Sequence, residues 1–221
     1  EAFVEAPLIL KSIRNDLQKT VDIQRILGKI NKDKASPRDL YFLGNTLEKI
    51  PIWEKILKGS KNRNLISFSK TFLDTSKLFE RIKYVISKNT PALLTNGNVI
   101  NRGVNAELDE LREVVSNGQK WLESFQGSLR KDLGIPKLKI GYNKIFGFYI
   151  EVTKSHQEKI PNSFTRKQTL TSSERYITEE LKEYEQKVLE AEQNIYNIQV
   201  KIFNDICIEI MNHIIKLQKN A

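Results

Sequence analysis

The sequence predicts a mainly α-helical protein with a helical core, two long antiparallel helices and a small β-sheet inserted at their tip. Three observations support this prediction. Apolar residues recur at helical spacing through most of the 221 residues. Residues 108–129 and 181–202 each show the alternating spacing of three and four that forms a heptad seam. Between them, residues 138–152 (LKIGYNKIFGFYIEV) alternate apolar with small or polar side chains, as strands do.

The first fifty residues predict two helices. Residues 8–30 place apolar side chains at near-helical spacing. In the next segment Ser36 can cap a helix, Pro37 suits its first position, and Asp39 suits the positive end of the helix dipole. This second helix is expected to continue through Ile50.

A third apolar pattern occupies residues 65–86 and ends before Pro91, because the residue before a proline disfavours the α conformation. Residues 96–97 (Asn-Gly) then predict a turn. The first hundred residues are therefore expected to form the helical core.

The two heptad segments predict a pair of helices. The first has Gly118 in its seam, and the second follows Thr178, which can cap a helix that extends to about residue 219. Each apolar stripe alone would leave apolar residues in water, so burial favours antiparallel pairing, with the intervening residues at the far end. The alternative is that both helices join one ordinary compact bundle.

The insert predicts a small sheet. Residues 138–142 and 146–152 are expected to form two strands around a bend at Asn143 and Lys144, and residues 165–170 can add a third. Apolar side chains of the second strand share one face: Phe146, Phe148, Ile150 and Val152. Because a small sheet needs one covered face, this row is expected to be core rather than a platform for base stacking.

The overall charge favours a polyanionic partner. Lys and Arg outnumber Asp and Glu by 36 to 27, giving a formal net charge of +9. Nucleic acid is the first expectation, followed by an acidic membrane surface or an acidic protein. The alternative is a general bias toward lysine that reflects no binding partner.

The single cysteine, Cys207, excludes an internal disulfide framework. No run approaches the roughly 18 apolar residues of a membrane span, and the start lacks a signal-peptide pattern, so a cytoplasmic location without membrane contact is expected.

Positive charge gathers in the insert. From Lys137 to Tyr176 the chain has eight Lys or Arg and three Glu, a surplus of five positive charges. Short hydrogen-bonding side chains accompany them: Asn143, Gln168, Thr169, Thr171, Ser172 and Ser173. Such a mixture suits phosphate oxygens, which need donors and positive charge but no base-edge reader. A solvated run of charges is the alternative.

Two stretches closely resemble the lever and clamp region of the MutS family of DNA mismatch-repair proteins: residues 138–155 (LKIGYNKIFGFYIEVTKS) and residues 166–185 (RKQTLTSSERYITEELKEYE). Residues 102–122 (RGVNAELDELREVVSNGQKWL) resemble that family's descending lever helix, and residues 35–40 (ASPRDL) are more weakly similar to its core-domain helices. These motifs are long and ungapped, and the likeness is strong over residues 99–187.

The resemblance implies three segments: 1–131 as helical core and descending lever, 132–177 as a β clamp that closes around duplex DNA, and 178–221 as the returning lever helix of the core. It implies DNA-backbone contacts at eight positions: Asn143, Lys144, Arg166, Lys167, Gln168, Thr171, Ser172 and Ser173. The family commonly has an asparagine-alanine pair before the Glu-Arg-Tyr run, where this chain has two serines. A serine can still donate to a phosphate, with a shorter reach.

The expected function is a sequence-independent DNA-binding and signal-transmitting module that works with the rest of a MutS-like chain and its dimer mate, without a cofactor. The family's mismatch-reading domain is not recognisable, and no GxxxxGK[ST] phosphate loop occurs. The chain is therefore expected to be an excised middle part without enzyme activity. The alternative is a structural coiled-coil interaction module whose basic tip binds an acidic protein; a nuclease comes third.

Candidate catalytic residues form no constellation in the sequence. They are His156, His213, Cys207, Glu179, Glu180 and Glu183. The histidines lie far apart, the cysteine stands between isoleucines as a core residue would, and no second acidic cluster accompanies the glutamates to hold two metal ions. We expect neither a catalytic nor a metal site.

Overall fold

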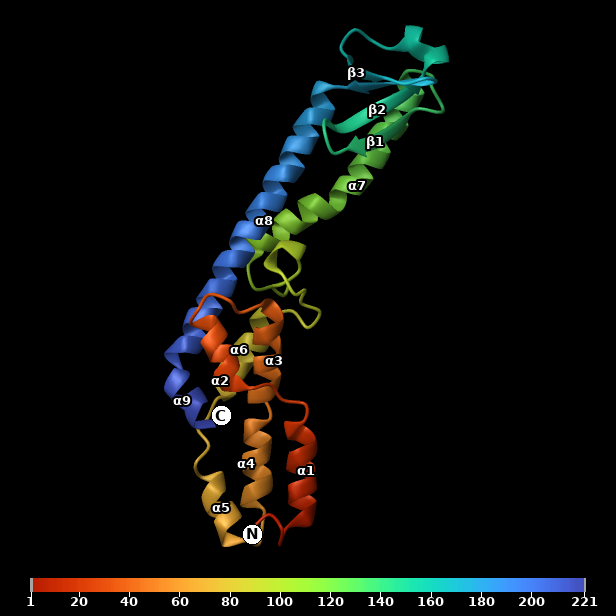
Figure 1. Ribbon diagram of the computed structural model, residues 1–221. Coiled ribbons are helices and arrows are strands. Elements are labelled where there is room, and N and C mark those ends of the chain that lie inside the picture. Colours follow the sequence, from red (N-terminus) through yellow and green to blue (C-terminus); the bar gives the residue numbers. More distant parts are fainter. Residues whose placement is uncertain (1, 221) are drawn as a thin grey trace. The chain divides into compact units, whose positions relative to one another are not determined.

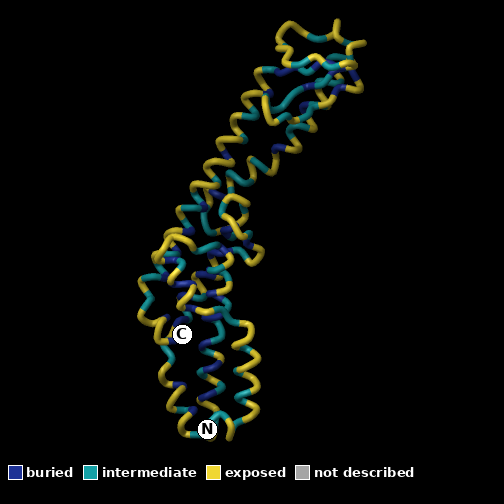
Figure 2. The backbone as a smooth tube through the Cα atoms, in the orientation of Figure 1, coloured by how far each residue is buried: buried dark blue, intermediate teal, exposed yellow. Residues whose placement is uncertain are grey.

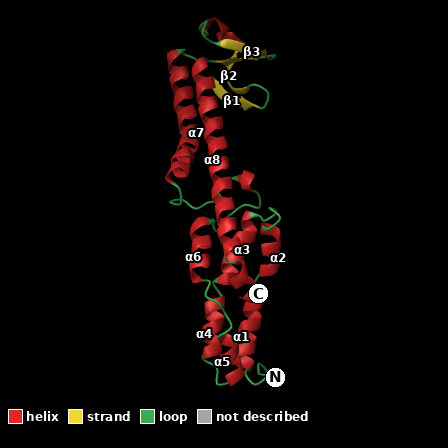
Figure 3. Cartoon of the chain, turned by 90° about the vertical axis from the view of Figure 1, so that its left-hand side faces the viewer, coloured by secondary structure: helices red, strands yellow, loops and turns green. Residues whose placement is uncertain are grey.

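The computed structural model describes residues 2–220 and is mainly helical, with one four-stranded antiparallel sheet (Figure 3). This confirms the predicted fold class. The chain divides into two compact units: the first contains residues up to 105 and from 196 onward, and the second contains residues 106–195. The division into segments 1–131, 132–177 and 178–221 remains a prediction.

The first unit is built from short helices. Their bounds are α1 Pro7–Leu17, α2 Ile23–Ile30, α3 Pro37–Leu47, α4 Ile50–Lys58, α5 Arg63–Ser69 and α6 Ser76–Val85, followed by the 3-10 turn η1 Leu94–Asn96. The first and third apolar patterns of the sequence are thus each divided into two helices, and the helix expected to continue through Ile50 ends at Leu47. Between α3 and α4 the cause is Pro51, which has no N–H to continue the α3 ladder. Before α2, Asp22 caps a new helix by accepting a hydrogen bond from the Arg25 N–H.

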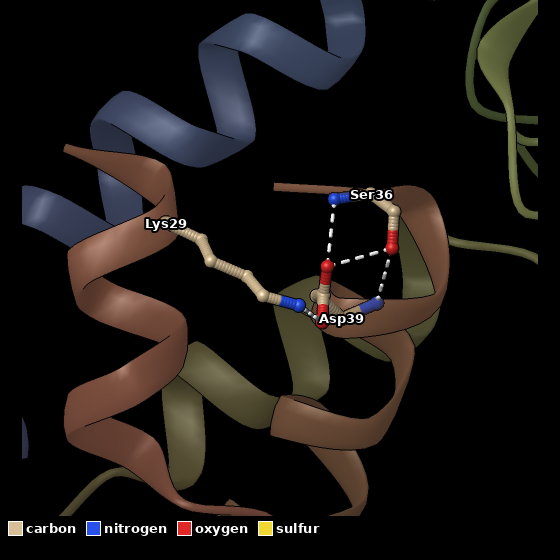
Figure 4. Close-up of polar contacts among 3 residues, drawn as sticks. All are labelled: Lys29, Ser36 and Asp39. Atoms are coloured by element: carbon tan, nitrogen blue, oxygen red, sulfur yellow. Dashed lines mark hydrogen bonds and ion pairs between the residues drawn. The ribbon is translucent and has the colours of Figure 1, made fainter. Parts of the chain in front are cut away.

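The start of α3 confirms the predicted cap and ties α2 to α3 (Figure 4). The Ser36 hydroxyl accepts a hydrogen bond from the Asp39 N–H at 3.2 Å, and Asp39 Oδ2 accepts from the Ser36 N–H at 2.9 Å. Lys29 Nζ, from α2, lies 2.7 Å from Asp39 Oδ1. Partial burial raises the pKa of Asp39, but the hydrogen bonds from Lys29 and Ser36 outweigh it and hold the pKa below its usual value.

The core of this unit lies between α3 and α6. Leu40, Leu43 and Leu47 recur on one face of α3 and are fully buried, as is Ile82 on α6. By contrast, α1 lies beside α4 (Figure 1) and has no buried residue, as its exposed and intermediate trace shows (Figure 2). The inner helices therefore carry most of the stability of this unit.

The second unit contains α7 (Ala106–Asp132), the sheet and the first part of α8 (Glu179–Asn212). The strands are β1 Lys139–Asn143, β2 Gly147–Thr153, β3 Thr165–Thr169 and β4 Ser173–Ile177, with the 3-10 helix η2 Lys154–Lys159 after β2. Their order is β1-β2-β4-β3. The inner strand β4 was not predicted, because apolar and polar side chains do not alternate regularly along its five residues.

The α7–α8 pair is antiparallel, as the heptad seams predicted. Phe125 of α7 and Leu181 of α8 are buried in one cluster, and Trp121 stacks on Tyr184 with ring centroids 4.1 Å apart. The Tyr184 hydroxyl occupies the space where a side chain at Gly118 would begin. The glycine in the seam therefore makes room for an aromatic ring.

The second heptad helix ends earlier than predicted. α8 stops at Asn212, and a separate short helix, α9 (Ile214–Asn220), follows. At the break, the His213 ring Nδ1 lies 2.9 Å from the Glu209 carbonyl oxygen, which would otherwise receive the backbone N–H of residue 213. That N–H bonds to the Ile210 carbonyl instead, which tightens the turn and ends the α-helical ladder.

Candidate nucleic-acid interface

One face of the sheet is core. Ile150 and Val152 of β2 and Tyr176 of β4 are buried against Phe125 and Leu181. The aromatic row is thus largely core, as predicted. Phe146 departs from this pattern: it lies in the turn before β2, and its ring centroid is 5.7 Å from that of Tyr149, which belongs to the opposite face. The expected second strand begins one residue later than predicted.

The opposite face is polar and its residues are aligned by strand register. Lys139 pairs with Glu151, Glu151 with Arg175, and Arg175 with Gln168, so four strands contribute to one cross-strand row. Arg175 Nε lies 2.9 Å from a Glu151 carboxylate oxygen, and its Nη1 donates to the Gln168 amide oxygen at 2.9 Å. The Arg175 guanidinium also lies over the Tyr149 ring, 4.3 Å from its centroid. This row holds the middle of the polar face rigid.

Arg166 and Gln168 emerge on opposite faces. Two residues apart in a regular strand, they would share a face, but a bulge between them pairs Arg166 with Tyr176 and Gln168 with Arg175. Arg166 Nη1 lies 3.1 Å from a carboxylate oxygen of buried Glu174. Lys167, in the bulge, is exposed.

Glu174 and Tyr176 form a buried polar pair on the core face. The Tyr176 hydroxyl donates to Glu174, and this bond, aided by Arg166, lowers the pKa of the Glu174 carboxyl against the effect of its desolvation. Burial and the bond to Glu174 raise the pKa of Tyr176 to about 12. Arg166 therefore has a structural partner in addition to any external ligand.

The predicted contacts at the two sheet ends are separated. Asn143 is the last residue of β1, and Lys144 follows it in the β1–β2 turn. Asn143 Oδ1 accepts a hydrogen bond from the Ile145 N–H at 2.8 Å, and Lys144 is exposed. Thr171 and Ser172 lie in the β3–β4 turn, which the antiparallel register places at the opposite end of the sheet. For strands of this length, at 3.3 Å per residue, the two turns stand roughly 20 Å apart.

The eight predicted residues thus differ in accessibility. Lys144, Arg166, Lys167, Thr171 and Ser172 are exposed; Asn143 and Gln168 are half-buried; Ser173 is buried. These residues are spread along the edge strand β3 and the two turns and are not gathered at one end of the sheet. Lys139 and Arg175 are among the eight cations counted from the sequence, but their alignment in the polar row was not predicted, because cross-strand neighbours cannot be known before β4 is recognised.

Two further residues considered as catalytic candidates, His156 and Cys207, interact with neighbouring groups of the fold. His156 lies in η2, with Nδ1 3.0 Å from the Thr153 hydroxyl. Burial, with the nearby Asp33 carboxylate, raises the pKa of the Cys207 thiol to about 12, whereas a nucleophilic cysteine has a lowered pKa. Among residues 2–220, no helix is both long enough and apolar enough to span a bilayer.

The chain has clear relatives. Residues 103–194 match MutS family domain IV. Proteins described as DNA mismatch repair protein MutS align with nearly the whole chain: that of Persephonella marina is 39% identical over 94% of the chain, that of Salinibacter ruber 35% over 100%, and that of Aquifex pyrophilus 35% over 100%. The chain covers 24%, 24% and 26% of these relatives, respectively. It therefore spans about a quarter of their length.

Proposed function

Because the chain belongs to the MutS family of DNA mismatch-repair proteins, we propose that its β-sheet segment, residues 132–177, is a clamp that binds the phosphate backbone of duplex DNA. The contacts position the protein on DNA without reading its sequence. The levers, α7 and α8, transmit the state of the clamp to the helical core. This role is exercised within a longer cytoplasmic chain and its dimer mate.

The observation that carries this proposal is the unbalanced charge of the sheet segment. Of its eight Lys and Arg side chains between residues 137 and 176, all of them described, two form ion pairs: Arg166 with Glu174 and Arg175 with Glu151. The lysines Lys144 and Lys167 remain exposed and without an ion pair in the described chain. Exposed lysines of this kind attract phosphates and release counterions when they bind.

The spacing of the exposed donors also suits a duplex backbone. A separation of roughly 20 Å between the two turns covers several phosphates of one strand, which recur about every 3.4 Å along the helix axis. The cross-strand row centred on Arg175 keeps the polar face rigid between them. A rigid surface loses little conformational entropy on binding.

ATP hydrolysis is implied by the resemblance for a whole MutS-like protein. Because this sequence has no phosphate-binding P-loop, we assign that activity to no residue of this chain. The clamp and levers would act as its DNA-facing and transmitting parts.

The test compares two double variants of this chain by fluorescence anisotropy with labelled duplex DNA between 50 and 200 mM salt, on the order of the range where such binding changes most. We expect weak binding, with Kd about 10⁻⁴ to 10⁻⁶ M and a log–log salt slope of about −3 to −4. Lys144→Ala with Lys167→Ala should flatten the slope by about 1.8, or about 0.9 per lost contact. Lysines are preferred to Arg166 here because Arg166 also holds Glu174.

The matched control is Lys11→Ala with Lys19→Ala, which removes the same charge from exposed residues of the other unit and should leave the slope unchanged. Matched and mismatched duplexes should bind alike. An equal effect of both variants, or a clear preference for a mismatch, contradicts the proposal. Binding to an acidic protein but not to DNA would favour the coiled-coil interaction module.

A further inference from the structure

A basic pocket lies where β1 begins, at the end of the sheet opposite the β1–β2 turn. It has a volume of about 420 Å³. Its lining comes from α7, the segment before β1, and the polar face of β1, β2 and β4: Arg130, Pro136, Lys137, Lys139, Glu151, Thr153 and Ser173. All seven residues belong to the second unit. Of the residues predicted to contact DNA, Ser173 alone lines it.

The charges of the pocket are not balanced from within. Its one carboxylate, Glu151, is already engaged by Arg175 at 2.9 Å. Lys137 and Lys139 are exposed and form no ion pair in the described chain. Arg130 uses Nε to donate to the Leu138 carbonyl oxygen at 2.7 Å, which fixes the guanidinium while its two terminal amino groups remain available. Three cationic side chains, Arg130, Lys137 and Lys139, therefore line one pocket, and none of them forms an ion pair within the described residues.

Hydroxyl groups complete the lining. Thr153 and Ser173 are direct cross-strand neighbours on β2 and β4. The Thr153 hydroxyl lies 3.0 Å from His156 Nδ1 and 3.1 Å from the Ser155 hydroxyl. Ser173 is 5% exposed and lines the pocket. Its hydroxyl can donate a hydrogen bond to a group bound there.

We propose that this pocket holds one backbone phosphate of a DNA strand. Phosphate oxygens accept charge-assisted hydrogen bonds from Lys and Arg together with bonds from hydroxyls, and the pocket presents both kinds of donor. The inference rests on the proposed DNA-binding function and extends it to the β1 edge of the sheet. It also gives Ser173 a route to DNA despite its burial, because Ser173 lines the pocket.

The experiment measures duplex binding of the 221-residue chain carrying Lys137→Gln with Lys139→Gln. The salt slope should flatten by about 1.8, and affinity at about 0.1 M salt should fall at least about tenfold. Lys120→Gln with Lys187→Gln is the matched control: both lysines are exposed and belong to the same unit but do not line this pocket. This control should change neither quantity, because charges beyond about 10 Å are screened.

A second measurement locates the phosphate. Inorganic phosphate added to isotope-labelled protein should shift the backbone amide signals of Thr153 and Ser173, and Lys137→Gln with Lys139→Gln should abolish the shifts. Ser173→Ala keeps a small side chain at a buried position, so the fold should persist while phosphate binding weakens. Unchanged circular dichroism in each variant guards against loss of folding.

The outcomes separate this inference from the proposed function. If the Lys144/Lys167 variant loses DNA affinity but the Lys137/Lys139 variant does not, the pocket inference fails and the clamp proposal stands. If neither variant loses affinity, both fail. Phosphate-induced shifts without any effect on DNA binding would make the pocket a site for small anions and would also overturn the inference.

Discussion

Asp39 joins two helices by accepting hydrogen bonds from Ser36 and Lys29. Asp39→Asn should lower the free energy of unfolding at pH 7 by about 1 kcal/mol, because an amide cannot replace the charge-assisted bond. The pKa of Asp39 is lower in the folded state, so its stabilisation is complete above the unfolded value of about 3.9 and is lost as pH falls through the folded pKa. The difference between wild type and variant should therefore shrink in acid.

Urea unfolding at pH 7 and at about pH 3 checks this expectation. Asp22→Asn is the control, since Asp22 caps α2 through a single bond from the Arg25 N–H and asparagine caps a helix about as well as aspartate. A pH-independent difference for Asp39→Asn would contradict the role assigned to its carboxylate.

Tyr176 should be the last tyrosine to ionise. Its pKa is raised to about 12 by burial and by the bond to Glu174, against about 10 for an ordinary phenol. A raised pKa means that folding favours the protonated hydroxyl. Its contribution to stability is therefore present below pH 10 and is lost as pH rises towards 12. An ultraviolet titration of the seven tyrosines should show a late component that Tyr176→Phe removes.

Tyr142→Phe is the control for that titration, because Tyr142 is 59% exposed. It should leave the late component in place. Loss of the late component in both variants, with circular dichroism still showing folded protein, would mean that Tyr176 is not the buried phenol.

At the scale of single elements, α7 contains two glycines whose substitution should have opposite effects. Gly127 is exposed with no atom within 4 Å of an added Cβ, so Gly127→Ala should stabilise the helix by about 1 kcal/mol. Gly118→Ala would meet the Tyr184 hydroxyl. Tyr184 cannot withdraw without leaving its stack on Trp121, so this substitution should destabilise by about 1–3 kcal/mol.

Thermal or urea unfolding of the two variants measures this difference directly. The pair is well matched, because helix, residue type and substitution are the same. Equal stabilisation by both alanines would show that the α7–α8 seam can open at Gly118 without cost.

At the scale of the whole molecule, each unit has its own core. A substitution in one core should therefore destabilise the unit that carries it. Leu138 in the second unit and Leu43 in the first are both fully buried. Leu138→Ala and Leu43→Ala should each destabilise by about 2–5 kcal/mol. Hydrogen exchange followed by mass spectrometry should find faster exchange in the unit that carries the substitution.

The first part of α8, residues 179–195, should follow the second unit, and residues 196–212 the first. Faster exchange throughout the chain in both variants would contradict two separate cores and indicate a single cooperative unit.

Much of the fold could be predicted because its determinants are local. The Ser36 cap, the capping role of Thr178 and the heptad seams rest on residues close in sequence, and each was confirmed. The breaks between α3 and α4 and at His213 were missed. They depend on a missing N–H and on a side-chain bond to a carbonyl, which an apolar pattern does not reveal.

By itself, the sequence determined the family, the helical class, the antiparallel seam and the concentration of positive charge between residues 137 and 176. Those properties are carried by residue identity and spacing. Only the tertiary structure decided which donors share a face. The β3 bulge turns Arg166 away from Gln168, and the inner position of β4 brings Ser173 into a pocket with Lys137. Register and strand order are set by contacts between distant residues, and a one-residue shift moves a side chain to the other face.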